Sequence, residues 1–475
     1  MEGREEEIQS KAGGRGSFIY MRRVKEVEPI HEVISLITEK FQTSFDFIEK
    51  KLHIDEKTAV LLYIKTVVNG ADLQEFIIKP FFELPTEHHY KSYLTSLPQQ
   101  QEIKGKEQIL DEMTRGSIVI IIQGSLLLLD IKKVHTDSVQ QVNLEPTIQG
   151  PELALSEDIA TNINLIRQRY HKPSLVVEIQ EIGGKSNQSL AIIYDSQSVN
   201  DAVLEKIKNK ITIIKHTPLI QTTAEMQRLL NEKKRSLLPI SMLTERTDRI
   251  IYNIAGGKVV LLLDGNPVSL IAPAVFFDFM SATEDNYRPF YLTIFNKSLR
   301  YLGLIICLTL PALYVAITSY NPEVFRFELA LSVSGSRIGV PYPSFIEVLF
   351  MLIVMELLIE ASIRLPKVIA GTATTVGGLI LGTAATEAAL TSTIMIIIVS
   401  AMAISTFVIP INEMGFAIRI IKYGVLLFAT IGGLLGLVLF MLGLFMYMAN
   451  MDSFGEPYFK LFLQRKTAEI EGDKT

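Results

Sequence analysis

The chain has 475 residues, 48% of them hydrophobic, and a formal net charge of −5. This charge and the lack of a large basic patch give no reason to expect a nucleic-acid partner. One cysteine, Cys307, excludes a disulfide framework or a thiolate metal site within one chain. Charged residues concentrate in residues 1–295, whereas long apolar runs fill residues 299–449. The two regions imply two solvents, water for the first and lipid for the second.

The N-terminus is polar and acidic, and it lacks the apolar stretch of a signal peptide. We therefore expect residues 1–28 to be disordered and the large N-terminal region to lie in the cytoplasm. Apolar residues then recur at helical spacing and predict a helix over residues 30–45. A second helix is predicted over residues 158–170, where arginines near the end suit a helix C-terminus.

Three β-hairpins are predicted where β-branched and apolar runs flank short turns. They cover residues 118–129, 175–194 and 259–271. The segments 116–124 and 257–265 share a pattern: a glycine opens each, an apolar run follows, and a turn glycine closes it. Either buried hairpins simply look alike, or the region holds two related α/β subdomains, residues 29–145 and 146–295.

Five apolar runs follow, each near the ~20 residues that a helix needs to cross a bilayer. They predict an all-α polytopic transmembrane domain over residues 296–450 and a tail over residues 451–475. The predicted fold is thus an α/β N-terminal cytoplasmic region followed by a transmembrane helical bundle. The runs cover residues 301–319, 345–363, 368–385, 390–411 and 424–448.

Basic residues predict the orientation of these runs. Three basic pairs lie on the same side if the first four runs each cross once, and the positive-inside rule makes that side cytoplasmic. The pairs are Lys297 with Arg300, Arg364 with Lys367, and Arg419 with Lys422. A fifth crossing would place Lys460 and Arg465 outside, which the rule disfavours. Either the tail is an exception or one run is not a simple span.

The soluble region holds two weak motifs. Gly184-Lys185-Ser186 ends like a phosphate-binding loop, but Ile179 stands where that motif needs glycine, and a strand follows instead of a helix. His88-His89 has no acidic or cysteine partner at ligand spacing, which favours a solvated loop. We expect no enzyme activity, no metal site and no cofactor.

The second apolar run carries the strongest chemical signal, because charges inside a bilayer need water or a partner. Glu356, Glu360 and Arg364 are spaced four apart on one helix face, and Glu347 lies nearer the start. One interpretation is an ion pair, with Arg364 as the structural partner of Glu360, that holds helices together. The other is a carboxylate stripe of Glu356, Glu360 and Glu347 that lines a water-filled path for cations.

Proline and glycine suggest how the runs are shaped and packed. Pro311 interrupts the first run and predicts a kink. Gly378 with Gly382, and Gly432 with Gly436, have the small-xxx-small spacing that lets helices approach closely. The pattern favours a bundle and is compatible with an oligomer.

Several motifs in one order resemble the A subunit of the GerA-type germination receptors of endospore-forming bacteria. The resemblance runs from about Gln149 to the tail, and residues 1–145 match more loosely. Thr247 stands where the family commonly has proline. The motifs are Gln149-Gly150-Pro151, Thr244-Glu245-Arg246-Thr247-Asp248-Arg249, Gly257-Lys258-Val259 leading to Asp264-Gly265, residues 273–279, residues 310–316, residues 360–366 and Ser453-Phe454-Gly455-Glu456-Pro457-Tyr458.

The resemblance implies a multi-pass protein of the spore inner membrane, surrounded by membrane lipid. Its partners would be a transporter-like B subunit that binds the germinant and a lipoprotein C subunit. The family's A subunit is thought to form a homo-oligomeric ring with a central path for monovalent cations. A non-conducting scaffold that couples the receptor to other germination proteins is the alternative. A transporter acting alone would need inverted repeats, which the apolar block lacks.

Overall fold

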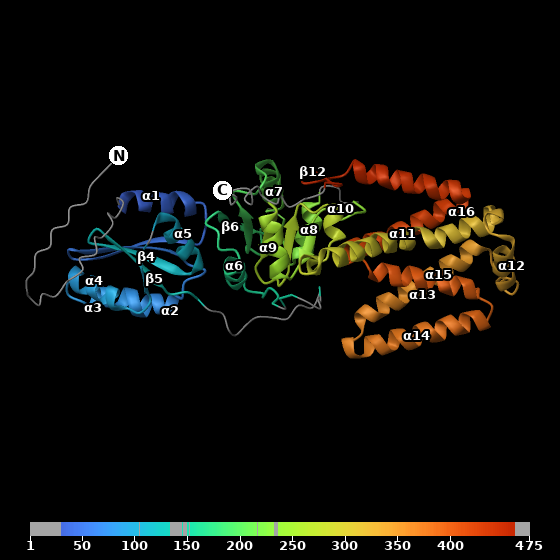
Figure 1. Ribbon diagram of the computed structural model, residues 1–475, viewed down its shortest axis with the longest axis horizontal. Coiled ribbons are helices and arrows are strands. Elements are labelled where there is room, and N and C mark those ends of the chain that lie inside the picture. Colours follow the sequence, from blue (N-terminus) through green and yellow to red (C-terminus); the bar gives the residue numbers. More distant parts are fainter. Residues whose placement is uncertain are drawn as a thin grey trace, which may run out of the picture.

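The computed structural model describes residues 30–103, 105–133, 145, 150–151, 153–215, 217–231 and 236–460. Residues 1–28, expected to be disordered, and residues 461–475 of the expected tail lie outside the described residues. Three parts follow one another along the long axis: two α/β domains, then a bundle of long helices (Figure 1).

The first domain is a five-stranded antiparallel sheet with helices on both faces, and its strand order is β1-β2-β4-β5-β3. Helices α1 and α5 pack on one face, and helices α3 and α4 on the other. The strands are β1 (Phe47–Ile54), β2 (Lys57–Ile64), β3 (Gln100–Gln101), β4 (Ser117–Ile122) and β5 (Ser125–Asp130). The helices are α1 (Ile30–Phe41), α2 (Gly70–Asp72), η1 (Leu73–Ile78), α3 (Lys79–Glu83), α4 (Glu87–Ser96) and α5 (Lys106–Arg115).

The second domain has the same topology. Its antiparallel sheet has the order β6-β7-β9-β10-β8, which repeats the order of the first sheet strand for strand. The strands are β6 (Leu175–Ile182), β7 (Gln188–Asp195), β8 (Met242–Thr244), β9 (Val259–Leu263) and β10 (Ser269–Ala272). The helices are α6 (Ile159–Arg167), α7 (Asp201–Ile214), α8 (Thr223–Leu230), α9 (Thr247–Ala255), α10 (Phe276–Phe279) and η2 (Thr283–Asn286). The shared order supports two related α/β subdomains.

The three predicted hairpins are confirmed as β4–β5, β6–β7 and β9–β10. The glycines that open the repeated segments both have positive φ, 114° at Gly116 and 81° at Gly257. A Cβ at Gly116 would lie 2.5 Å from Lys132 Cβ, and one at Gly257 would lie 2.3 Å from the Ser198 carbonyl oxygen. Only glycine fits these two turns, because the next strand or loop approaches too closely for a side chain.

The predicted helix over residues 30–45 is too long. The helix ends at Phe41, and Phe45 lies 57% exposed in the turn before β1. The Phe45 N–H donates to the Val177 carbonyl of the second domain at 2.8 Å, so an interdomain contact takes this residue out of the helix. The predicted helix over residues 158–170 likewise ends early, at Arg167.

Arg167 joins the two domains. Its Nε donates to Asp46 Oδ2 and its Nη2 to Asp46 Oδ1, each at 2.7 Å, and both side chains are almost fully buried. Burial alone would raise the pKa of Asp46, but the Arg167 charge and hydrogen bonds from Arg167, Thr66 and Ser44 outweigh burial and lower it. The paired charges and the Phe45 hydrogen bond hold the domains together.

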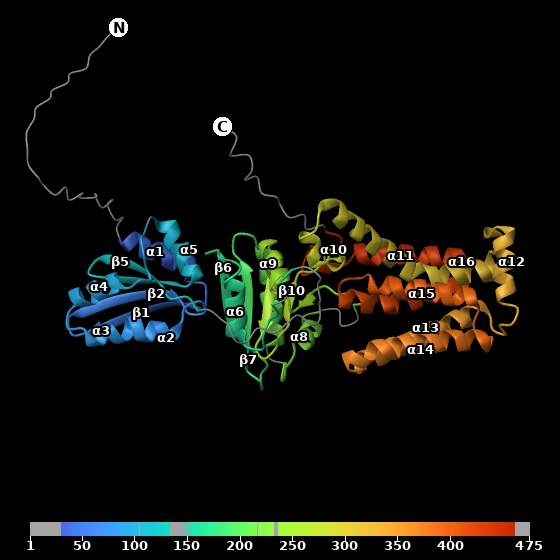
Figure 2. The same cartoon turned by 60° about the horizontal axis from the view of Figure 1, so that its bottom comes forward.

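Long helices form the third part. They are α11 (Phe290–Tyr320), α12 (Phe327–Ser336), α13 (Ser344–Arg364), α14 (Lys367–Glu387), α15 (Thr393–Phe407) and α16 (Asn412–Ala449), with the short η3 (Pro322–Val324). Helix α11 packs on α16 and α15, while α14 packs chiefly on α13 at the edge of the bundle (Figure 2). Within the described residues, α11 and α16 are long and apolar enough to cross a membrane.

Helix α16 is folded back on itself. A straight helix of its 38 residues would be ~57 Å long. Yet Glu413 near its start accepts a hydrogen bond from Leu243 N, and Tyr447 near its end accepts one from Leu237 N. Six residues of chain separate these two donors and span at most ~22 Å. The expected single run over residues 424–448 is therefore wrong: the helix starts at Asn412 and reverses.

The reversal occurs at Gly433, whose φ of 59° and ψ of −140° are not helical. Past it, the Phe440 ring packs against Phe428 at a centroid distance of 5.1 Å, so the two arms lie side by side. Tyr320, at the end of α11, donates to the Ile431 carbonyl and covers Gly433 with its ring. The α16 hairpin thus returns the chain to the side of the α/β domains.

The chain after α16 completes the second domain. A small hairpin of β11 (Asp452–Ser453) and β12 (Glu456–Pro457) lies against that domain (Figure 1). Tyr458 is fully buried, and its hydroxyl donates to the Pro239 carbonyl at 2.9 Å. Ser453 Oγ donates to the Ile240 carbonyl and accepts from Ala274 N. Residues about 200 positions apart in the sequence therefore share one core.

Candidate functional site

Glu356 of α13 is paired with two cations of α16. Its Oε2 accepts from Arg419 Nε at 2.7 Å, and its Oε1 accepts from Lys422 Nζ at 2.6 Å. The Glu356 side chain is 21% exposed and that of Lys422 only 3%. Helix α13 packs chiefly on α11, α14 and α15, so these ion pairs tie it to α16. The three side chains carry a net positive charge inside the bundle.

Glu360 and Arg364 form the other pair on α13, one turn and two turns beyond Glu356. Arg364 Nη2 donates to Glu360 Oε1 at 2.7 Å. Both side chains are largely exposed, 77% for Arg364 and 53% for Glu360. The expected ion pair is present, and it lies on the surface of this chain. Of the three candidate carboxylates, Glu360 is the most exposed.

Glu347 is fully buried at the opposite end of α13. Its Oε1 accepts from Ser392 N and Ser392 Oγ, each at 2.7 Å, and from Thr391 Oγ1. Arg337 Nε lies 3.3 Å from its Oε2. A carboxylate at the first turn of α15 is stabilised by the helix dipole and its free N–H groups. Glu347 therefore connects α13, α15 and the segment after α12.

The sequence interpretation missed Arg419, Lys422 and Arg337 as partners. It placed Arg419 and Lys422 in a loop after the fourth run, whereas the structure places both on the first arm of α16. The signal was present: apart from Arg419, residues 416–421 are all apolar, so the apolar run that starts at Gly424 can be extended back through them. The three-residue spacing of Arg419 and Lys422 then puts both on one face.

Pro311 lies buried inside α11, which continues through it for 31 residues in all. Among the paired glycines, a Cβ at Gly378 would lie 3.7 Å from Leu358 of α13, and one at Gly436 would lie 2.0 Å from the Phe428 carbonyl of the other α16 arm. Gly382 and Gly432 face open space in this chain. A role for these two in helix packing between copies stays a prediction.

The charged residues of the motif over residues 244–249 form a cluster of hydrogen bonds and ion pairs next to the bundle. Arg246 donates to both oxygens of Asp248, and the Tyr287 hydroxyl donates to Asp248 Oδ2 at 2.9 Å. Burial would raise the pKa of Asp248, but these hydrogen bonds and the Arg246 charge lower it. Arg249 Nε lies 2.9 Å from Glu145 Oε2. The acidic and basic groups of the motif are thus engaged locally.

Two further buried ion pairs lie nearby, the first within the second domain and the second between that domain and α11. Lys258 Nζ lies 2.6 Å from Asp278 Oδ2, and Arg300 Nη2 donates to Asp285 Oδ1 at 2.9 Å. Burial lowers the pKa of Lys258, and the Asp278 carboxylate opposes that shift. Within the described part of the chain, no group of three His, Cys, Asp or Glu side chains could hold a metal ion. The charges named here are paired with one another.

The fold and these charges define a class: a protein with two α/β domains of the same strand order, joined to an apolar helical bundle that contains buried ion pairs. The family profile described as the Bacillus/Clostridium GerA spore germination protein matches residues 35–472. The chain belongs to this family of spore germination proteins.

Two relatives found by sequence agree with this assignment. The chain is 34% identical to spore germination protein GerLA of Bacillus cereus, over 74% of this chain and 71% of the relative. It is 30% identical to spore germination protein A1 of Bacillus subtilis, over 92% of each. The crystal structure of the N-terminal domain of the A subunit of the Bacillus megaterium spore germinant receptor GerK3 aligns with 54% of this chain and 99% of that chain, with a TM-score of 0.39 and 22% identity.

Proposed function

We propose that the protein is the A subunit of a nutrient-responsive spore germinant receptor and acts with a transporter-like B subunit and a lipoprotein C subunit. The observation that carries the proposal is the family match, which extends over both α/β domains and the bundle. The bundle would cross the spore inner membrane several times, with the α/β domains in the cytoplasm.

The α16 hairpin supports an even number of crossings. Since the second domain includes Tyr458, the chain after α16 must lie on the same side of the membrane as that domain. With two crossings in α16, Lys460 joins Arg364 and Arg419 on the cytoplasmic side, as the positive-inside rule favours. The conflict that a single fifth crossing creates is thereby removed.

The finer proposal is that several copies form a ring whose path conducts monovalent cations. Glu360 is the best candidate to line it, because its carboxylate is exposed and repeats once per copy. Glu356 would set the position of α13 against α16, and Glu347 the position of α13 against α15. A movement of the second domain would displace the α16 hairpin, which is hydrogen-bonded to it, and α16 would then displace α13 through the ion pairs of Glu356.

A non-conducting signalling scaffold is the second candidate. One observation favours it: all three candidate carboxylates accept from donors within the same chain, and among them the pair of Glu360 with Arg364 is the exposed one. A carboxylate neutralised by Arg419 and Lys422 attracts cations weakly, so a path would have to depend on Glu360.

Cation efflux from nutrient-treated spores tests the two candidates. Glu360→Gln removes the exposed charge and Glu360→Lys reverses it, while efflux is normalised to subunit abundance by immunoblot. Glu83→Gln is the matched control, since Glu83 forms an exposed i,i+4 pair with Lys79 outside the bundle. A conducting ring predicts slower efflux per subunit in Glu360→Gln, slower still in Glu360→Lys, and normal efflux in Glu83→Gln. Normal efflux per subunit in both Glu360 variants would favour the scaffold.

A further inference from the structure

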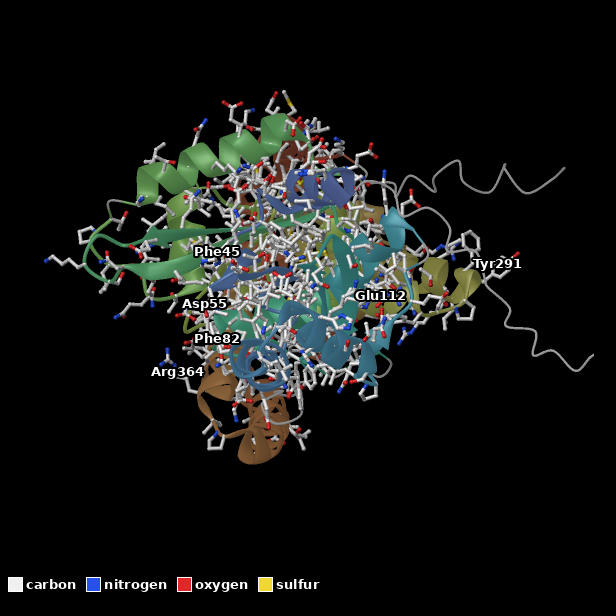
Figure 3. All side chains as sticks on the ribbon, turned by 90° about the vertical axis from the view of Figure 1, so that its left-hand side faces the viewer. Phe45, Asp55, Phe82, Glu112, Tyr291 and Arg364 are labelled. Carbon is white, nitrogen blue, oxygen red and sulfur yellow. The ribbon has the colours of Figure 1, made fainter. Side chains whose placement is uncertain are left out.

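The first ten residues of α11, residues 290–299, form an arm outside the bundle. Gly303 marks where the bundle begins, because a Cβ there would lie 3.3 Å from the Ser405 carbonyl near the end of α15. In the end-on view, the helix leans out of the body and Tyr291 lies at its outer edge (Figure 3). The arm therefore extends sideways at the level where the bundle meets the second domain.

One side of the arm is polar and attached to that domain. Thr293 Oγ1 donates to the Asp285 carbonyl at 3.1 Å. At the end of the arm, Arg300 pairs with the Asp285 carboxylate, and both side chains are buried. These contacts fix which face of the arm turns outward.

The outward face is broad, apolar and uncovered. Phe290 is 71% exposed, Tyr291 85% and Phe295 59%. At 100° per residue, the apolar side chains of the arm occupy an arc of about 200°. The arc includes Leu292, Ile294 and Leu299, all of them exposed.

The same exposed face continues into the part of α11 that lies in the bundle, through Leu302 and Ile305. Helix α11 has 31 residues and is ~46 Å long, whereas the hydrocarbon core of a bilayer is ~30 Å thick. The arm accounts for the length by which α11 exceeds the hydrocarbon core, so it lies at the membrane–water interface, where tryptophan and tyrosine are enriched. A wide convex face suits lipid, which can wrap it, better than one flat protein surface.

We propose that residues 290–299 form a lipid-binding arm, with Phe290, Tyr291 and Phe295 at the boundary between headgroups and acyl chains on the cytoplasmic side. The inference rests on the proposed insertion of the bundle in the membrane. Through Asp285 and Arg300 the arm holds the second domain at a fixed height above the bilayer. Changes in the packing of that lipid layer would thereby act on the second domain.

The chain contains no tryptophan, so a single introduced tryptophan reports its own surroundings. The full chain carrying Tyr291→Trp is reconstituted in phosphatidylcholine–phosphatidylglycerol vesicles whose acyl chains are brominated near the headgroup or near the methyl end. We expect short-wavelength emission and about twofold quenching by the shallow bromines, with less by the deep ones, as an interfacial depth of ~5–10 Å requires. Phe295→Trp repeats the measurement one turn along the arm.

Two matched variants complete the test. Phe82→Trp in the first domain, 50% exposed and far from the bundle, should not be quenched. Leu435→Trp in α16, 68% exposed and two residues past the reversal at Gly433, should be quenched by the brominated acyl chains if α16 crosses the membrane. Unquenched long-wavelength emission at positions 291 and 295 would show a solvated arm, and unquenched short-wavelength emission would show a second copy covering it. Either result overturns the proposal while Leu435→Trp still reports insertion, whereas loss of quenching at position 435 as well would overturn the insertion itself.

Discussion

Glu356→Gln tests whether the ion pairs between α13 and α16 hold the bundle together. Glutamine keeps the size of the side chain and can still accept a hydrogen bond, but it removes the negative charge that pairs with Arg419 and Lys422. Lys422 is 3% exposed and Arg419 17%, so water cannot solvate the two remaining cations well. They would face one another across a site without a carboxylate.

The size of the effect follows from burial. Breaking a buried ion pair costs roughly 3–5 kcal/mol, because a charge is left without a partner. Since Glu356 and Arg419 keep about a fifth of their exposure, we expect the low end, about 3 kcal/mol, which is on the order of a hundredfold in the folding equilibrium. Lys422→Met alone should cost much less, because Glu356 keeps Arg419. The double variant Glu356→Gln, Lys422→Met should recover part of the loss.

Two measurements check this prediction: subunit abundance in membranes by immunoblot, and the thermal midpoint of the purified chain in detergent. We expect abundance and thermal midpoint to decrease in the order wild type, Lys422→Met, double variant, Glu356→Gln. A wild-type midpoint for Glu356→Gln, or a double variant no more stable than Glu356→Gln, would refute the view that the carboxylate balances two buried cations.

Three further predictions concern the α16 turn, the C-terminal segment and the interface of the α/β domains. Gly433→Ala should lower the thermal midpoint of the purified chain by an amount matching about 1–3 kcal/mol, because alanine is strained at φ 59°; Gly432→Ala, in open space, is the control and should change little. Tyr458→Ala should lower the free energy of unfolding of the second domain, measured by circular dichroism, by about 3–5 kcal/mol. A fragment of the α/β region should gain stability when residues 451–460 are fused to it. An equally stable fragment without these residues would count against a shared core. The folded-state pKa of Asp46 lies below its ordinary value of 3.8, so the stability from its pair with Arg167 is present above about pH 4 and is lost as pH falls through the lowered pKa. Asp46→Asn should flatten that part of the profile of unfolding free energy against pH, and an unchanged acid limb would contradict the assignment.

Local patterns in the sequence were enough for the strands of three hairpins, but they did not reveal β1, β2, β3 or β8. Each of the three hairpins has β-branched and apolar runs on both sides of a short turn that contains glycine, so it can be predicted from neighbours in the chain. The repeat at Gly116 and Gly257 was visible for the same reason, since a positive φ restricts the residue type wherever the chain turns. The ion pair of Glu360 with Arg364 also follows from spacing within one helix.

Only the tertiary structure decided which charges meet across helices and where the chain turns back. Glu356 is 63 residues from Arg419, and hydropathy treats a basic pair between two apolar runs as a loop. Helix α16 remains apolar through Gly432-Gly433, and glycines inside an apolar run suit close helix packing as well as a turn. Its reversal is therefore decided by Tyr320 of α11 and by contacts with the second domain. Tyr458 completes a core that begins about 200 residues earlier, and a pattern read over one turn of helix or one strand cannot report contacts at that separation.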